Sequence, residues 1–185
     1  ALDAVLLDKD GRFTIGGLVQ GRYRIYVQVP NNDVLQVPEW FATTAIAGGA
    51  SEGDALDVPF DLTPAGGPEI AITLTNDTQE LDGVVRDAAG HAARDCTVVV
   101  FPVDPRFWFQ QSRRIVTRQS DRDGRFVFGV GAGLPVGEYF LAVVPDGRPG
   151  EPLDVLMLEE LAATAVKVAL NANESKTMDL KVIRP

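Results

Sequence analysis

The sequence contains few of the residues that build metal sites, disulfides and nucleophilic centres. Its 185 residues include one cysteine, Cys96, and one histidine, His91. A single cysteine excludes an internal disulfide and any metal site that needs several cysteines. No phosphate-binding loop, dinucleotide fingerprint, Ser-His-Asp set or zinc-ligand spacing is present, so we expect no cofactor and no metal.

Long apolar runs and positive charge are also lacking. No run reaches the ~18 apolar residues that a membrane-spanning helix requires. The 17 Lys and Arg residues are outnumbered by 26 Asp and Glu residues, which gives a net charge of −9. Nucleic acids and anionic membrane surfaces bind through clustered basic residues. The sequence therefore predicts neither nucleic-acid binding nor membrane insertion.

Strand patterns dominate what is present. Residues 21–29 (GRYRIYVQV) alternate between apolar and polar side chains, which is the period of a half-buried strand. Residues 96–101, 137–144 and 176–183 are similarly short, rich in β-branched or aromatic residues, and bounded by turn-forming residues. The pattern predicts an all-β fold of antiparallel β-sandwiches. Only residues 152–161 (PLDVLMLEEL) show helical spacing, and we expect this helix to cap an open end of the second sandwich.

An internal repeat divides the chain. DKDGRF at 8–13 matches DRDGRF at 121–126, and GRYRIYVQVP matches GEYFLAVVP. The apolar positions of 58–74 also match those of 166–182 at a constant offset of 108 (166 − 58). We therefore predict two tandem sandwich units, residues 1–78 and residues 79–185, joined near 75–80.

The first repeat is expected to lack its N-terminal strands. In the second repeat the Asp-x-Asp-Gly turn begins 40 residues after the repeat starts (121 − 81), whereas 7 residues precede it in the first. The difference of 33 residues (40 − 7) corresponds to two or three strands. Two explanations stay open: the sequence is a piece of a longer multi-domain protein, or another chain supplies the missing strands.

Three segments of the second repeat carry a family resemblance. They are LDGVVRDAAGHAARDCTVVVFP (81–102), SDRDGRFVF (120–128) and LPVGEYFLAVV (134–144). With them, residues 79–185 resemble the bacterial carboxypeptidase regulatory-like domain, a transthyretin-like or immunoglobulin-like β-sandwich. Residues 8–74 carry the second half of the same pattern. The resemblance implies an accessory module without catalytic residues, of a kind found in tandem in large envelope or secreted bacterial proteins.

The repeated Asp-x-Asp-Gly motif could begin a calcium loop or form a tight turn. A helix–loop–helix calcium site needs a bidentate acid at its twelfth position. With Asp121 as the first residue the twelfth is Ala132, and with Gly124 as the sixth it is Val130. The first copy, at Asp8, supplies no acid either. We predict turns, in which Asp caps the backbone and Gly provides positive φ.

Cys96 and His91 could in principle form a nucleophile and its base. However, Cys96 begins a Val-rich strand and His91 lies in a predicted loop, DAAGHAARD. A reactive thiol needs an accessible, electropositive pocket. We interpret Cys96 as a small buried residue and His91 as a surface residue.

The stretch PRFWFQQSRR (105–114) is the candidate ligand or partner surface. Its aromatic residues could stack on a sugar or peptide, and its arginines could bind carboxylates. The candidate residues are Arg106, Phe107, Trp108, Phe109, Arg113 and Arg114. In the alternative interpretation Trp108 packs over an edge of the sandwich and the arginines pair with acids. A further alternative is docking on the acidic first repeat of a neighbouring copy. Residues 39–41 (EWF) are interpreted as a surface loop in which Trp40 packs locally.

We expect a non-catalytic structural or interaction module of a larger exported bacterial protein. Its partners would be other domains of the polypeptide or neighbouring subunits, and its location periplasmic, cell-surface or secreted, as the family resemblance implies. Two alternatives stay open: a module that binds a glycan or acidic peptide through the Trp108 loop, and a self-assembling subunit completed by a neighbour's strand.

Overall fold

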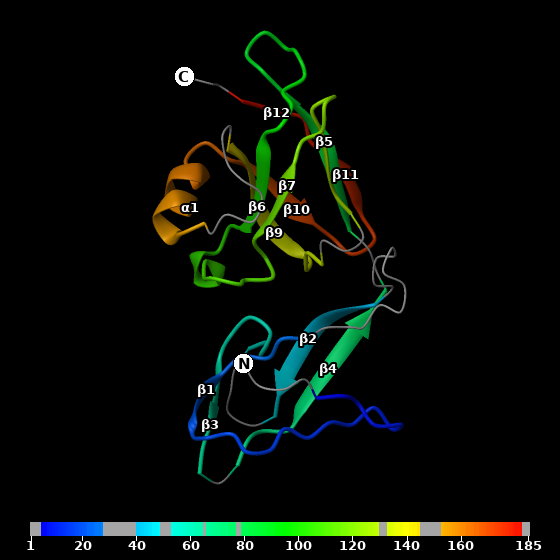
Figure 1. Ribbon diagram of the computed structural model, residues 1–185, viewed down its shortest axis with the longest axis vertical. Coiled ribbons are helices and arrows are strands. Elements are labelled where there is room, and N and C mark those ends of the chain that lie inside the picture. The colour runs from blue at the N-terminus through cyan, green and yellow to red at the C-terminus, as the bar shows by residue number, and fades with distance from the viewer. Residues whose placement is uncertain are drawn as a thin grey trace. The chain divides into compact units, whose positions relative to one another are not determined.

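The computed structural model describes residues 5–27, 40–48, 53–64, 66–76, 79–129, 133–144 and 153–182. In these ranges the chain consists of strands with one α-helix and one short 3-10 helix (Figure 1), which confirms the predicted all-β class. In chain order the elements are β1 Gly21–Tyr23, β2 Phe41–Ala47, β3 Phe60–Leu62, β4 Ile70–Thr75, β5 Glu80–Arg86, β6 Thr97–Pro102, η1 Pro105–Phe107, β7 Val116–Gln119, β8 Arg125–Phe128, β9 Gly137–Val144, α1 Val155–Ala162, β10 Val166–Leu170, β11 Ser175–Thr177 and β12 Leu180–Lys181.

The chain divides into two compact units. The first unit contains the described residues of 1–26 and 44–71, and the second contains those of 27–43 and 72–185. Strands β2 and β4 pair with each other and each extends across this division. The predicted boundary between residues 78 and 79 stays a prediction.

The second unit is a β-sandwich of two four-stranded sheets. One sheet has the strand order β10-β9-β6-β7, and in the other β5 pairs with β8, β11 and β12. Side chains of both sheets form a single apolar core. From the first sheet come Val98, Val100, Tyr139, Leu141, Val168 and Leu170; from the second come Leu81, Val85, Phe126, Phe128 and Leu180.

Strand β6 is buried on both faces, which explains its unbroken apolar sequence. Val98 and Val100 face the sandwich core, whereas Val99 and Phe101 face a second cluster on the outer side of the sheet. Leu158 of α1 belongs to that outer cluster. The helix therefore covers the outer face of the β6–β9 sheet and does not cap an end of the sandwich, as Figure 1 also shows.

The repeat seen in the sequence is present as the same strand pairing in both units. In the first unit, β1 pairs with β3 so that Gly21 lies opposite Leu62. In the second unit, β9 pairs with β10 so that the equivalent Gly137 lies opposite Leu170. The two antiparallel pairs continue in step, with Tyr23 opposite Phe60 and Tyr139 opposite Val168.

The repeated tyrosine makes the same hydrogen bond in each unit. The Tyr23 hydroxyl donates a hydrogen bond of 2.7 Å to the carbonyl of Val19, four residues earlier. The Tyr139 hydroxyl donates one of the same length to the carbonyl of Pro135. The two halves are therefore related by structure as well as by sequence.

The sheets are antiparallel except beside β5, where β11 and β12 run parallel to it. The expected continuous strand over 176–183 is interrupted at Met178 and Asp179, although the pairing register with β5 is the same on both sides. Here the Met178 amide donates to the Asp82 carbonyl at 2.7 Å, and the Val84 amide donates to the Asp179 carboxylate. Gly83 lies directly beside this interruption. A Cβ atom at Gly83 would lie 2.0 Å from the Met178 carbonyl oxygen, so the close approach of the two backbones requires glycine.

Other predicted elements differ at their ends. The strand expected over 21–29 ends at Tyr23, and its positions 28 and 29 lie outside the described residues. The expected helix over 152–161 is observed at Val155–Ala162, after an N-cap in which the Asp154 carboxylate accepts from the Met157 amide at 2.8 Å. Residues 152 and 183, the expected ends of the helix and the last strand, are likewise outside the described residues.

Candidate functional site

The candidate surface lies in the connection between β6 and β7. It begins with η1, where the Asp104 carboxylate accepts a hydrogen bond of 3.0 Å from the Arg106 amide and one of 2.8 Å from the Arg106 side chain. These bonds hold the pKa of Asp104 below its ordinary value and raise the pKa of Arg106. The two charges are therefore paired within the loop at neutral pH.

Trp108 points into the protein. Only 8% of its surface is exposed, and it belongs to the outer apolar cluster with Phe101, whose ring centroid is 5.7 Å away. Its indole N–H donates a 2.7 Å hydrogen bond to the carbonyl of Pro102. Because both the ring and the polar atom of Trp108 are engaged internally, the residue serves the packing of the outer cluster.

Phe107 remains half-buried at the surface with two arginines over its ring. The guanidinium carbon of Arg114 lies 4.7 Å from the ring centroid, and that of Arg106 lies 5.9 Å from it. Arg114 also donates to the Tyr139 hydroxyl at 3.4 Å. The remaining candidates, Phe109 and Arg113, are half-buried and take part in interactions within the protein.

A pocket of about 240 Å³ opens beside Phe107. Its lining consists of Pro102, Val103, Asp104, Phe107, Arg114, Gly137 and Glu138. The structure thus brings Phe107 and Arg114 to one hollow and places Trp108 in the interior. Glu138 and Gly137 come from the start of β9, and no local pattern in the sequence indicates that they lie beside this loop.

The repeated Asp-x-Asp-Gly motif forms tight turns in both units. In the second unit one carboxylate oxygen of Asp121 accepts hydrogen bonds of 2.9 Å from the amides of Asp123 and Arg125. In the first unit Asp8 accepts equivalent bonds, also of 2.9 Å, from the amides two and four residues later. This geometry agrees with the predicted turns. Within the described ranges, no group of three or more Asp, Glu, His or Cys side chains could hold a metal ion.

A third turn of this kind was not recognised from the sequence. Asp87 accepts hydrogen bonds of 2.9 Å from the amides of Ala89 and His91, although its segment reads DAAGH and lacks the second acid. The sequence signal that could have identified this turn is an Asp followed three residues later by a glycine, as Gly90 follows Asp87, and then by a polar residue. The hydrogen bond from the His91 amide is the main cause of the lowered pKa of Asp87.

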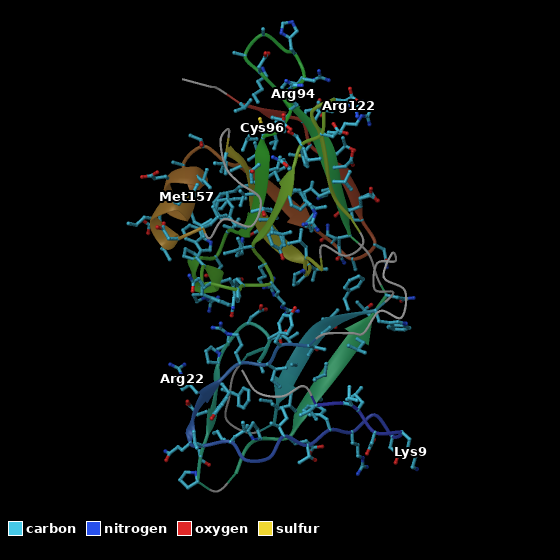
Figure 2. All side chains as sticks on the ribbon, in the orientation of Figure 1. Lys9, Arg22, Arg94, Cys96, Arg122 and Met157 are labelled. Atoms are coloured by element: carbon cyan, nitrogen blue, oxygen red, sulfur yellow. The ribbon has the colours of Figure 1, made fainter. Side chains whose placement is uncertain are left out.

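His91 and Cys96 have separate environments. The His91 side chain is 81% exposed and lies 3.5 Å from the Asp87 carboxylate. Cys96 is fully buried in the sandwich core, directly before β6 (Figure 2). Their interpretation as a surface histidine and a small core residue agrees with these positions.

The EWF segment is partly a strand. Phe41 begins β2, and the side chain of Trp40, directly before it, is 46% exposed. The expected surface loop is therefore wrong for Phe41, and residue 39 lies outside the described residues. The sequence FATTAIA gave no clear strand signal because small Ala and Thr residues occupy most of β2.

Repeat-related core positions are less buried in the first unit. Ile15 is 41% exposed, whereas its counterpart Phe128 is 1% exposed. Phe13 and Tyr23 are half-buried, whereas their counterparts Phe126 and Tyr139 are buried. Completion of the first unit by a neighbour's strand stays a prediction.

No helix within the described ranges is both long and apolar enough to span a membrane.

No family model matches the chain, and no curated protein matches it. Several solved structures are similar at low identity. Catechol 1,2-dioxygenase from Acinetobacter is 15% identical over 58% of this chain and 53% of its own, with a TM-score of 0.34.

Two further solved structures have comparable scores. The 5-hydroxyisourate hydrolase of Klebsiella pneumoniae is 14% identical over 57% of this chain and 84% of its own, with a TM-score of 0.33. The major pilin subunit of Bacillus cereus is 14% identical over 74% of this chain and 40% of its own, with a TM-score of 0.37. The chain thus spans about half the length of the dioxygenase and less than half of the pilin. At this level of similarity the β-sandwich assignment rests on the strand pairing described above, and no activity is transferred.

Proposed function

We propose that the chain is a non-catalytic structural module related to the carboxypeptidase regulatory-like domains. In this proposal it acts as a spacer and scaffold within a larger exported bacterial protein, in the periplasm, at the cell surface or outside the cell. Its partners are neighbouring domains or subunits. Two observations support this proposal: residues 79–185 resemble that family, and the candidate residues are engaged within the fold.

The observation that carries this proposal is that the chemically distinctive side chains are used to build the fold. The carboxylates of Asp8, Asp87 and Asp121 accept hydrogen bonds from their own turns. Cys96 is fully buried, and Trp108 packs in the outer cluster. Groups engaged in this way contribute to stability and are poorly placed to act on a substrate.

The pocket beside Phe107 supports a second candidate, a glycan-binding module. An aromatic ring with neighbouring polar groups is suited to a sugar. The lining carries the carboxylates of Asp104 and Glu138 and the guanidinium of Arg114, and Arg106 beside it is paired with Asp104 (2 − 2 = 0). Because these charges balance, a neutral glycan fits the pocket better than an acidic peptide does.

A binding screen separates the two candidates. We expect the full chain to show no saturable binding to arrayed glycans or acidic peptides. The variant Phe107→Ala tests the pocket, and Arg122→Gln is its control, because Arg122 is exposed in the turn after Asp121 and outside the pocket. Binding that is lost in Phe107→Ala and kept in Arg122→Gln would establish the glycan or peptide module and overturn the structural proposal.

A further inference from the structure

From residue 79 onward, the first strand of the second unit is β5 and the last two are β11 and β12. Both β11 and β12 lie beside β5 and run parallel to it. Residues Glu80–Asp82 of β5 pair with β11, and Val85 and Arg86 pair with β12. Figure 1 shows these strands side by side within the second unit. The chain therefore enters the ladder at its Glu80 end and leaves it at the opposite end, at Lys181.

This arrangement determines how tension would act on the unit. Adjacent parallel strands that are pulled from the start of one and the end of the other slide along each other. Their hydrogen bonds cross the gap between the strands, so the sliding motion loads all of them together. In a hairpin pulled from its open end, by contrast, the bonds break one after another.

Hydrogen bonds connect β5 with the segment that contains β11 and β12, from one end of β5 to the other. At the entry end the Glu80 amide donates to the Glu174 carbonyl at 3.0 Å. At the exit end the Val182 amide donates to the Arg86 carbonyl at 2.8 Å. Between them, side chains contribute as well: the Asp179 carboxylate accepts from the Val84 amide at 3.1 Å and lies 3.8 Å from the Arg86 guanidinium.

Two further features oppose sliding. The carbonyl oxygen of Met178 lies 2.0 Å from the place that a Cβ atom of Gly83 would occupy, so the two backbones approach closely at this point. In addition, Leu81 of β5 and Leu180 of β12 are both buried in the same core, at 1% and 4% exposure. Movement of either strand along its axis must withdraw these side chains from the core.

We propose that the second unit is a load-bearing module, in which β5, β11 and β12 form a shear clamp that resists tension along the polypeptide. The inference rests on the proposed structural function and specifies it. It applies to force transmitted through the chain itself, with β5 and β12 as the points where the load enters and leaves. The clamp consists of β5, β11, β12 and the connecting residues Met178 and Asp179.

Single-molecule stretching of the full chain from its two ends tests this inference. We expect the second unit to unfold in one step when the chain is pulled from its two ends. The comparison pulls the same unit from Arg122 and the C-terminal end, and we expect a lower unfolding force there. Gly124, in the turn with Arg122, bonds to Val85, and Lys181 pairs with Arg86, so these two attachment points lie at the same end of the sheet. Equal forces in the two directions would overturn the clamp.

A matched pair of variants gives a second readout. Asp179→Ala removes an acceptor within the clamp, and Asp121→Ala removes an acceptor in a turn outside it; both are exposed carboxylates that bind backbone amides. We expect both to lower the thermal midpoint, but only Asp179→Ala to lower the unfolding force. An equal loss of force in Asp121→Ala would contradict the inference. If the force is independent of direction and the glycan screen stays negative, the clamp is wrong and the structural proposal stands.

Discussion

Replacement of Gly83 by alanine is expected to lower the free energy of unfolding by about 3 kcal/mol, the upper part of the range for overpacked interiors. The added Cβ atom would meet the Met178 carbonyl oxygen at 2.0 Å and its carbonyl carbon at 2.7 Å. Since both contacts are with backbone, no rotation of a flexible side chain relieves them. The backbone at Met178 would have to move away from β5, which breaks the hydrogen bond between Met178 and Asp82. Urea unfolding followed by circular dichroism measures the change.

Gly129→Ala is the control for this substitution. A Cβ atom at Gly129 would meet only a methyl group of Val127, at 3.4 Å, which is an ordinary van der Waals contact. We expect its effect to stay within about 0.5 kcal/mol. Equal stability of Gly83→Ala and the native chain would mean that the Met178 carbonyl does not lie against Gly83.

Trp108→Ala is expected to cost about 3–5 kcal/mol, the range for removing a large buried aromatic side chain. The substitution empties the space beside Phe101 and leaves the Pro102 carbonyl without its indole donor. Trp108→Phe should cost less, because it keeps most of the apolar contact and loses only the hydrogen bond. Both effects are measured by denaturant unfolding of the full chain.

Trp40→Ala serves as the matched control, since Trp40 is the other tryptophan and is 46% exposed. We expect a loss of no more than about 1 kcal/mol. Fluorescence adds an independent check: the blue-shifted component of the emission should disappear in Trp108→Ala and persist in Trp40→Ala. A Trp108→Ala variant with native stability would contradict the packing role and favour recognition by this loop.

The sequence predicted those parts of the fold that depend on local patterns. Strand β9 was predicted with its exact bounds, because its apolar and aromatic residues lie between a glycine and a proline. The Asp121 turn followed from the hydrogen-bonding capacity of Asp and the conformational freedom of Gly124, whose φ is +73°. The sequence repeat has a structural counterpart in the common register of the β1–β3 and β9–β10 pairs, although the pairing itself was not predicted.

The features that escaped prediction depend on contacts distant in sequence. The close approach of Met178 to β5 is possible because the residue opposite it, 95 positions earlier (178 − 83), is Gly83. The parallel pairing of β5 with the last strands has no local signature either. Similarly, the periodicity of α1 indicated an apolar face but not that Leu158 would pack on the outer side of the β6–β9 sheet.

The candidate site shows the same limit. The sequence identified an aromatic and arginine-rich loop, but the direction of each side chain depended on the tertiary structure. Trp108 packs inward against Phe101 and donates a hydrogen bond to the Pro102 carbonyl, whereas Phe107 lies at the surface beneath Arg114. Composition therefore suggested a recognition surface, and packing determined which of its residues are accessible.

From residue 79 onward, the first strand of the second unit, β5, is hydrogen-bonded side by side and parallel to the last strands, β11 and β12. Amide hydrogen exchange followed by NMR on the full chain tests this pairing directly. The amides of Val84, Met178 and Val182 donate the bonds that join these strands. We predict that they exchange slowly, at rates governed by unfolding of the whole unit. Exchange of these three amides at the rates of an unstructured peptide, while the amides of β6 and β9 stay protected, would show that β5 is not paired with β11 and β12.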